Sequence, residues 1–195
     1  MNLISTITIL FPTLGKFLNL RKLIIIKLSI ILSLLILRNG QFSVYGLTLG
    51  IPSILAAITF RYSTNDLKFK NQLNFALQFL FPIIAITLFC INPIGKSAFL
   101  YSFYWFIPMA IYLLSMFSNK NNYILASISS TFIAHSCGSI IWLYCLPTNQ
   151  AFWLALIPKV AFERLGIIVG MIITYNFLVV LKRSLKKSQL ILKNL

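Results

Sequence analysis

The chain has 195 residues, of which 59% are hydrophobic and only 10% are charged, and its mean hydropathy is +0.91. Soluble domains carry roughly 25% charged residues, so this composition excludes a water-soluble globular protein. The formal net charge of +15 would fit nucleic-acid binding in a soluble protein, but membrane topology and anionic lipid headgroups explain it here, and we expect no nucleic-acid partner.

Runs of about 20 residues without formal charge predict the fold, because a helix of that length crosses the hydrocarbon core of a bilayer. We expect an all-α, single-domain bundle of about six transmembrane helices. The predicted spans cover residues 23–38, 42–60, 73–94, 98–117, 123–146 and 161–181. Residues 1–22 are expected to form an N-terminal interfacial segment or cap, and residues 182–195 a basic cytoplasmic tail.

The basic residues predict the orientation of this bundle. With the N-terminus inside, the outer loops hold Arg38 and Lys96, Lys159 lies in the segment before the sixth span, and the cytoplasmic parts hold twelve Lys and Arg residues. The twelve are Lys16, Arg21, Lys22, Arg61, Lys68, Lys70, Lys120, Lys182, Arg183, Lys186, Lys187 and Lys193. Because cytoplasmic loops are enriched in Lys and Arg, both termini are predicted to be cytoplasmic.

The second predicted span contains Gly46, Gly50 and Pro52 shortly after Tyr45. These residues fit a locally unwound helix at a binding site, and they equally fit close helix packing with a proline kink.

The fourth predicted span opens with Tyr101, Tyr104 and Trp105, an aromatic group in the outer half of the membrane. The group fits a wall of a binding pocket, and it also fits an interfacial aromatic belt.

The fifth predicted span carries two neighbouring faces. The first is a ridge of small residues at every fourth position, made of Ala126, Ser130, Ala134 and Gly138. The second is a polar face, made of Thr131, His135, Ser139 and Trp142. The ridge predicts close packing of another helix. For His135 two interpretations are open, a histidine satisfied by a neighbouring serine or carbonyl group, and a ligand or proton contact.

The segment before the sixth predicted span contains Pro158, which predicts a break that leaves residues 151–157 as an interfacial or re-entrant piece. Glu163 and Arg164 follow at the outer end of the span, with Lys159 one turn before Glu163 as a possible partner. They either contact a solute or anchor the helix end as an ion pair. Gly166 and Gly170 form a GxxxG packing ridge on the same helix.

Polar and aromatic residues of four predicted spans therefore converge on the outer membrane half. The candidate substrate-binding residues are Tyr45, Tyr104, Trp105, Thr131, His135, Ser139, Trp142, Glu163 and Arg164. Aromatic faces with a few polar groups suit a small organic solute.

Catalytic and metal sites are not expected. The chain contains only two acidic residues, no GxSG loop and no Walker motif, so we expect no enzyme and no ATPase of its own. Cys137 and Cys145 are eight residues apart on one helix, about 12 Å along its axis, which is too far for a disulfide. One His and one Glu within the spans are too few ligands for a metal, and no cofactor is expected.

The segment "FIAHSCGSIIWLYCLPTNQAFWLALIPKVAFERLGIIVGM", residues 132–171, together with six spans and cytoplasmic termini, resembles the substrate-binding S component of bacterial energy-coupling factor (ECF) transporters. The resemblance implies uptake of a vitamin-like solute across the bacterial cytoplasmic (inner) membrane. It also implies a membrane-coupling T subunit and two ATPase subunits supplied in trans. Small residues spaced by four on the first span dock against the T subunit in that family, and the matching positions here are Ser29 and Ser33.

Two functions from other classes stay open. A membrane scaffold or assembly protein without a solute would use the same polar residues only to hold helices together. An intramembrane enzyme is the third possibility, with the weakest support in the sequence.

Overall fold

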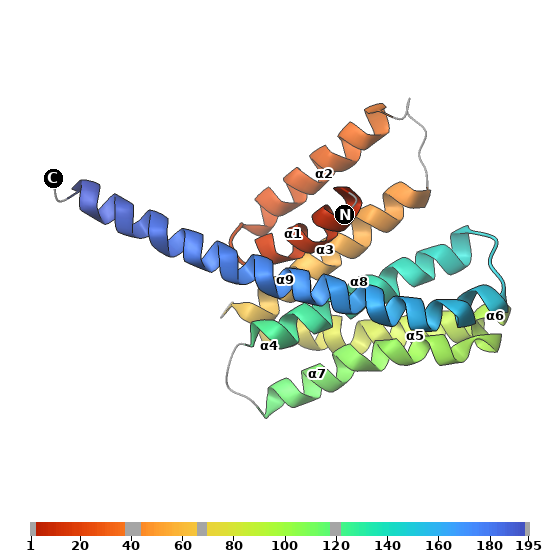
Figure 1. The fold of residues 1–195 in the computed structure, drawn as a ribbon. Helices are drawn as coiled ribbons and strands as arrows, with labels where there is room; N and C mark the ends of the chain where they lie inside the picture. The colour runs from red at the N-terminus through yellow and green to blue at the C-terminus, as the bar shows by residue number, and fades with distance from the viewer. Residues whose placement is uncertain (1–2, 38–43, 66–69, 118–121, 194–195) are drawn as a thin grey trace.

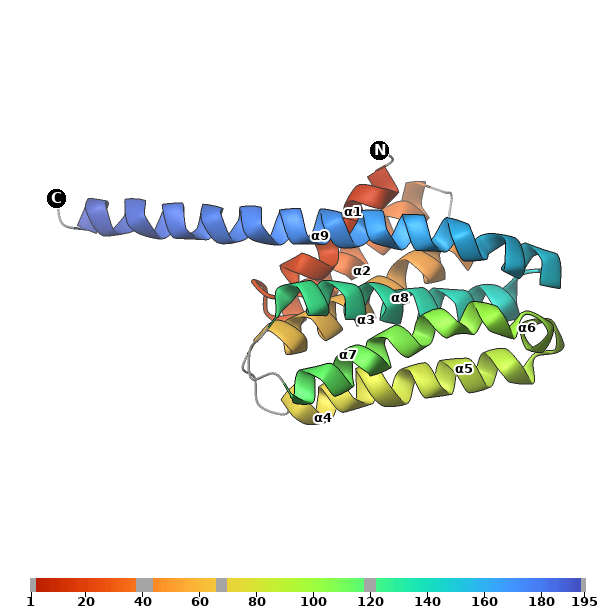
Figure 2. The same cartoon turned by 60° about the horizontal axis from the view of Figure 1, so that its bottom comes forward.

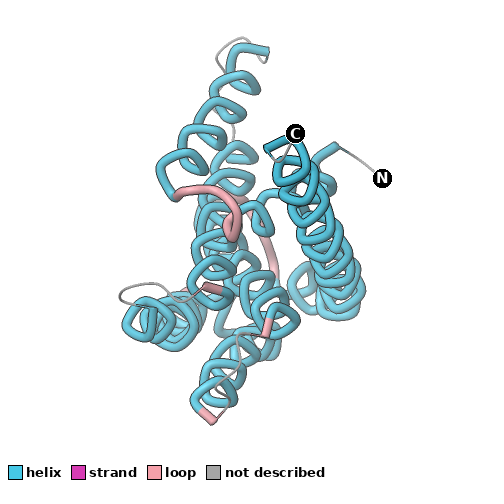
Figure 3. Tube along the Cα trace, turned by 90° about the vertical axis from the view of Figure 1, so that its left-hand side faces the viewer, coloured by secondary structure: helices cyan, strands magenta, loops and turns pink. Residues whose placement is uncertain are grey.

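The computed structural model describes residues 3–37, 44–65, 70–117 and 122–193, and every regular element in these ranges is a helix (Figures 1 and 3). In chain order the elements are α1 (Leu3–Leu14), α2 (Leu20–Leu37), α3 (Val44–Thr64), α4 (Lys70–Phe75), η1 (Ala76–Leu80), α5 (Phe81–Ile91), α6 (Pro93–Ser97), η2 (Phe99–Trp105), α7 (Phe106–Met116), α8 (Tyr123–Cys145) and α9 (Gln150–Lys193). η1 is a π-helix and η2 is a 3-10 helix. The predicted all-α class is confirmed.

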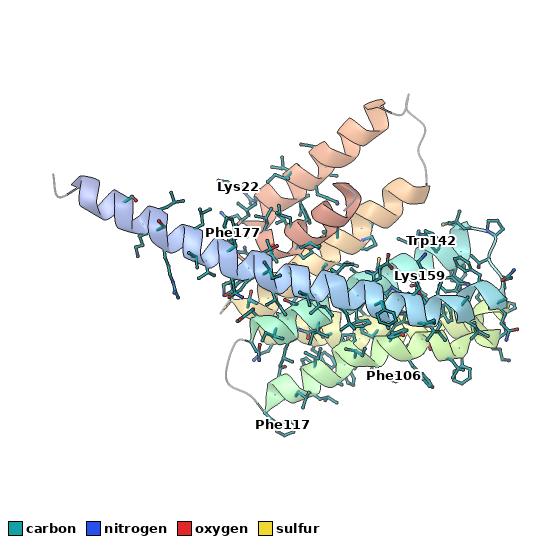
Figure 4. The ribbon with its side chains drawn as sticks, in the orientation of Figure 1. Lys22, Phe106, Phe117, Trp142, Lys159 and Phe177 are labelled. Atoms are coloured by element: carbon teal, nitrogen blue, oxygen red, sulfur yellow. The ribbon has the colours of Figure 1, made fainter. Side chains whose placement is uncertain are left out.

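Four helical segments are long and apolar enough to cross a membrane. They are Asn71–Ile91, Phe99–Met116, Tyr123–Cys145 and Gln150–Lys186. Large apolar side chains on their surfaces are exposed, and Figure 4 shows Phe106 and Phe117 projecting outward beside α7. Such surfaces suit contact with lipid. These features indicate an integral membrane protein.

The last four predicted spans each fall on one of these segments. The first two predicted spans fall on α2 and α3, whose passage across a membrane stays a prediction. α3 is helical without interruption from Val44 to Thr64, so of the two interpretations for Pro52 the structure favours helix packing over a locally unwound helix. Proline is tolerated inside a membrane helix when neighbouring helices pack around it, and Pro52 is buried here.

α8 is the central helix of the bundle. Of its most apolar 18-residue window, 61% is buried inside the structure, against 11% for α9. α3 and α8 form the most extensive helix contact in the described ranges. A Cβ atom placed on Gly138 would lie 3.7 Å from Cγ of Pro52. The ridge of small residues therefore packs against α3 as predicted.

α9 runs through Pro158 as one continuous helix, visible along its whole length in Figure 2, so the predicted break is wrong. The physical reason is packing on both sides of the proline. Trp153 and Val160 are buried in the same hydrophobic cluster, with exposed fractions of 1% and 4%. The hydroxyl group of Tyr104 also donates a hydrogen bond of 2.7 Å to the carbonyl group of Ile157. Neighbouring groups thus hold the helix where proline removes a backbone donor.

α1 packs against α3 and α9 (Figure 1), and its position relative to the membrane interface stays a prediction. At its end, the guanidinium group of Arg61 on α3 donates hydrogen bonds to the carbonyl groups of Gly15 and Leu18. In return, the Nζ atom of Lys16 donates a hydrogen bond of 2.8 Å to the carbonyl group of Thr64. Cations at the last carbonyl groups of a helix are favourable, so Lys16 caps α3, while Arg61 holds the turn that follows α1.

Candidate functional site

Tyr101 is the centre of an aromatic cluster, which we call the Tyr101 cluster, where η2 meets α5, α8 and α9. Only 2% of Tyr101 is exposed. Five rings lie around it, at centroid distances of 4.9 Å for Trp153, 5.4 Å for His135, 5.9 Å for Phe89, and 6.3 Å for both Tyr104 and Trp105. These distances are typical of edge-to-face and offset ring contacts.

The 3-10 geometry of η2 explains how one short element supplies Tyr101 itself and two of the rings around it, Tyr104 and Trp105. A 3-10 helix has three residues per turn, which places Tyr101 and Tyr104 on the same face. Phe103 on the other side of the element is 54% exposed. η2 therefore separates an inward aromatic face from an outward apolar one.

The polar face predicted for α8 points in part toward this cluster. His135 is 7% exposed, and its ring contacts Tyr101, Tyr104 and Phe132. Ser139, one turn later, shares a hydrogen bond of 3.3 Å with the hydroxyl group of Tyr101. The structure thus brings His135, Ser139, Tyr104 and Trp105 together around Tyr101.

Three buried side-chain nitrogen atoms have no hydrogen-bond partner in the part of the chain that the structure describes. They are Nε1 of Trp105, Nε2 of His135 and Nε of Arg164. The first two belong to the Tyr101 cluster, and Arg164 interacts electrostatically with both Tyr101 and His135. Buried polar atoms are nearly always paired, so three unpaired ones around one tyrosine mark this region as unusual.

Arg164 reaches the cluster from α9 and pairs with its chain neighbour. Its Nη2 atom lies 3.5 Å from Oε2 of Glu163. The side chain of Arg164 is 18% exposed and that of Glu163 is 55% exposed, so the carboxylate lies nearer the surface of the bundle than the guanidinium group does. The predicted pairing of Lys159 with Glu163 is wrong: among the described residues no ion pair joins them, and Lys159 is exposed on α9 (Figure 4).

Other predicted site residues lie away from Tyr101. The hydroxyl group of Thr131 donates to the carbonyl group of Ser127 and contacts Sδ of Met171 at 3.4 Å. Trp142 stacks on Phe152, with ring planes at 10° and centroids 6.2 Å apart. Thr131 therefore contacts α9 from α8, while Trp142 packs at the edge of the hydrophobic cluster that contains Tyr101.

Two of the predicted residues lie outside the described side chains, and a third lies on the surface of α2. The side chains of Tyr45 and Ser33 are outside them. Ser29 is exposed on α2, and its hydroxyl group donates to the carbonyl group of Ile25. The roles of Tyr45, Ser29 and Ser33 stay predictions.

Sequence reasoning placed Tyr101 in an aromatic group with Tyr104 and Trp105 but left it out of the candidate binding residues, and it missed Phe89 and Trp153 altogether. For Tyr101 a signal existed, because it precedes Tyr104 and Trp105 by three and four residues, the spacing of one helix face. Phe89 and Trp153 carry no comparable signal, since apolar residues that face lipid or protein are equally frequent on such helices.

A second polar cluster, around Gln78, lies at the opposite end of α8. Nε2 of Gln78 donates to Oγ of Ser63 at 2.9 Å and to Oδ1 of Asn74 at 3.2 Å, and its Oε1 atom accepts from Ser129 at 2.8 Å. Gln78 belongs to the π-helix η1. Both the nitrogen and the oxygen of its amide are paired, so we interpret this cluster as a set of hydrogen bonds between helices and not as a binding site.

The described residues contain no group of three or more His, Cys, Asp or Glu side chains that could hold a metal ion. The Tyr101 cluster instead offers aromatic faces, an imidazole, an indole N–H group and a guanidinium group. No protein-family model, curated protein or solved structure matches the chain.

Proposed function

We propose that this protein is a solute-capture subunit, similar to an S component, of an ECF-type uptake transporter in the bacterial cytoplasmic membrane. The observation that carries the proposal is that two buried, unpaired nitrogen atoms belong to one aromatic cluster, and that a third, on Arg164, interacts electrostatically with the same cluster. Leaving a buried donor or acceptor unpaired costs about 1–3 kcal/mol. A bound solute that supplies the missing partners would recover this free energy.

The distribution of basic residues supports the proposal. In the six-span topology with both termini cytoplasmic, the Tyr101 cluster lies in the outer half of the membrane and the Gln78 cluster in the inner half. A small organic micronutrient would reach the Tyr101 cluster from outside. The chain itself would then catalyse no reaction and hold no cofactor. A T subunit and ATPase subunits in trans would supply the energy, with Ser29 and Ser33 as the proposed docking positions.

Solute binding to the purified protein tests this function. The protein in lipid nanodiscs is heated with each member of a vitamin panel, and native mass spectrometry searches for a solute retained through purification. A solute at a hundred times its Kd stabilises the folded state by about 2.7 kcal/mol. We expect one panel member to raise the melting temperature by several degrees.

Two variants make this test specific to the Tyr101 cluster. His135→Ala is expected to abolish the solute-dependent rise. Gly166→Ala is a matched control on α9, because a Cβ atom there would meet nothing within 4 Å. The proposal is wrong if no panel member stabilises the protein, no solute is retained, and no T or ATPase subunit co-purifies.

A scaffold function is the second candidate, and the tight packing of the cluster favours it. The exposed fractions of Tyr101, Trp105 and Trp153 are 2%, 0% and 1%, so these rings are tightly packed in this structure. A scaffold predicts that His135→Ala and Glu163→Gln impair folding or complex formation, while no solute changes the melting temperature of any variant.

A further inference from the structure

We infer that the Tyr101 cluster binds a solute through a carboxylate group, with Arg164, Trp105 and His135 as its polar contacts. The inference rests on the proposed function and names the chemical class of solute that this site would select.

The donor inventory of the cluster is the first argument. An indole N–H and a guanidinium N–H can only donate hydrogen bonds, so the unpaired atoms of Trp105 and Arg164 both require an acceptor. The unpaired His135 nitrogen donates as well in one of its two tautomers. A solute that satisfies these atoms must therefore present acceptor atoms to at least two donors.

The hydroxyl groups of the cluster are already engaged within the protein. That of Tyr101 is bonded to Ser139, and that of Tyr104 donates to the carbonyl group of Ile157. Tyr104 therefore has no proton left to donate to a solute, although each hydroxyl oxygen keeps acceptor capacity. The donors without a partner are the nitrogen atoms of Trp105 and Arg164.

The charge of Arg164 is the second argument. Glu163 meets only the Nη2 atom, at 3.5 Å, and its own side chain is 55% exposed, whereas Nε of Arg164 is buried. A buried cation is stabilised by an anion in direct contact, and a guanidinium group binds a carboxylate through two parallel hydrogen bonds. Glu163 compensates part of this charge through Nη2, and a solute carboxylate would add an anion at Nε, whereas an amide or alcohol would only accept the hydrogen bond there.

Entry of a solute requires some of the rings to separate, because the cluster is packed in this structure. η2 is the element suited to this movement. It is a 3-10 helix of seven residues, longer than the usual short runs, and the hydrogen-bond geometry of a 3-10 helix is poorer than that of the α-helix α7 that follows it. Rotation of η2 would move Tyr101, Tyr104 and Trp105 together.

Matched acid and neutral solutes test the inference on the wild-type protein in nanodiscs. The probes are nicotinate with nicotinamide, pantothenate with pantothenol, and biotin with biotin amide. Binding is measured by thermal shift and by calorimetry. We expect the acid of at least one pair to bind at least tenfold more tightly than its neutral partner.

Variants of the polar contacts complete the test. Arg164→Gln is expected to remove the preference for the acid, and Arg164→Lys to keep part of it. If Arg164→Gln does not fold, Trp105→Phe keeps a large ring, removes only the N–H donor, and is expected to weaken binding of the acid several-fold. Gly166→Ala is the control and should bind as the wild type does.

The possible failures are distinguishable. If the neutral member of a binding pair binds as tightly as the acid, or if a vitamin-panel solute without a carboxylate binds, the carboxylate inference is overturned and the proposed function stands. If no pair and no panel solute binds, both are overturned.

Discussion

The hydroxyl groups of Tyr101 on η2 and Ser139 on α8 lie 3.3 Å apart and join these two elements by a hydrogen bond. Ser139 follows His135 by one turn, so the bond fixes the ring of Tyr101 beside the imidazole at a centroid distance of 5.4 Å. One polar contact thereby positions the aromatic centre of the candidate site.

Tyr101→Phe removes this hydrogen bond and keeps the ring. We expect a loss of about 0.5–1.5 kcal/mol of unfolding free energy, because Ser139 can turn its hydroxyl group to a carbonyl group of its own helix. Tyr101→Ala also empties the ring's volume and should cost about 3–5 kcal/mol. Unfolding in mixed micelles with increasing SDS measures both variants. Equal losses for the two would show that the hydroxyl group, and not the ring, holds the cluster together.

The position of the apolar helices could be predicted from the sequence, but their contacts could not. The predicted span 123–146 agrees closely with α8, because length and absence of charge are sufficient to recognise it. The shared face of His135 and Ser139 followed from helix periodicity. In a membrane protein, however, residues that face lipid and residues that face the protein interior are both apolar, so the residue type does not show which of them are buried. Tyr101 is buried and Phe103 is exposed on the same element, and only the fold reveals this difference.

The wrong prediction at Pro158 and the continuous helix at Pro52 have a related cause. Local propensity predicts a break or unwinding at proline. At Pro158 the packing of Trp153 and Val160 outweighs that preference. At Pro52 the packing of α8 does so. These contacts come from residues far away in the sequence, which a local pattern does not contain.

Gln78→Leu tests whether the Gln78 cluster connects the helices. The substitution removes the bonds to Ser63, Asn74 and Ser129 and leaves their polar atoms near an apolar side chain. We expect a loss of about 1–3 kcal/mol in the same unfolding experiment. Thr87→Val is the control, because Thr87 is exposed and bonds only its own helix, and it should stay within about 0.5 kcal/mol of wild type. A neutral Gln78→Leu would contradict the proposed role.

Gly15→Ala and Gly166→Ala are expected to act in opposite directions. A Cβ atom on Gly15 would lie 2.4 Å from the carbonyl oxygen of Ala57, so α1 and α3 must separate. Overpacking of this kind costs about 1–3 kcal/mol. At Gly166 the added methyl group meets nothing within 4 Å, and the higher helix propensity of alanine should stabilise α9 by up to about 1 kcal/mol. Thermal unfolding of the two variants measures the difference. A harmless Gly15→Ala would argue against the close contact of α1 with α3.

Cysteine labelling tests the proposed orientation of the bundle. In a variant whose native cysteines Cys90, Cys137 and Cys145 are replaced by alanine, a single cysteine is introduced at Ser97 or at Ser188, both of which are exposed. Ser97 follows the third predicted span and should be outside, whereas Ser188 follows the sixth and should be inside. A membrane-impermeant maleimide should therefore label Ser97→Cys in intact cells and Ser188→Cys only after permeabilisation. The reverse pattern would invert the topology and place the Tyr101 cluster in the cytoplasmic half. Labelling of both in intact cells would mean that the number of spans between them is even, and not three as proposed.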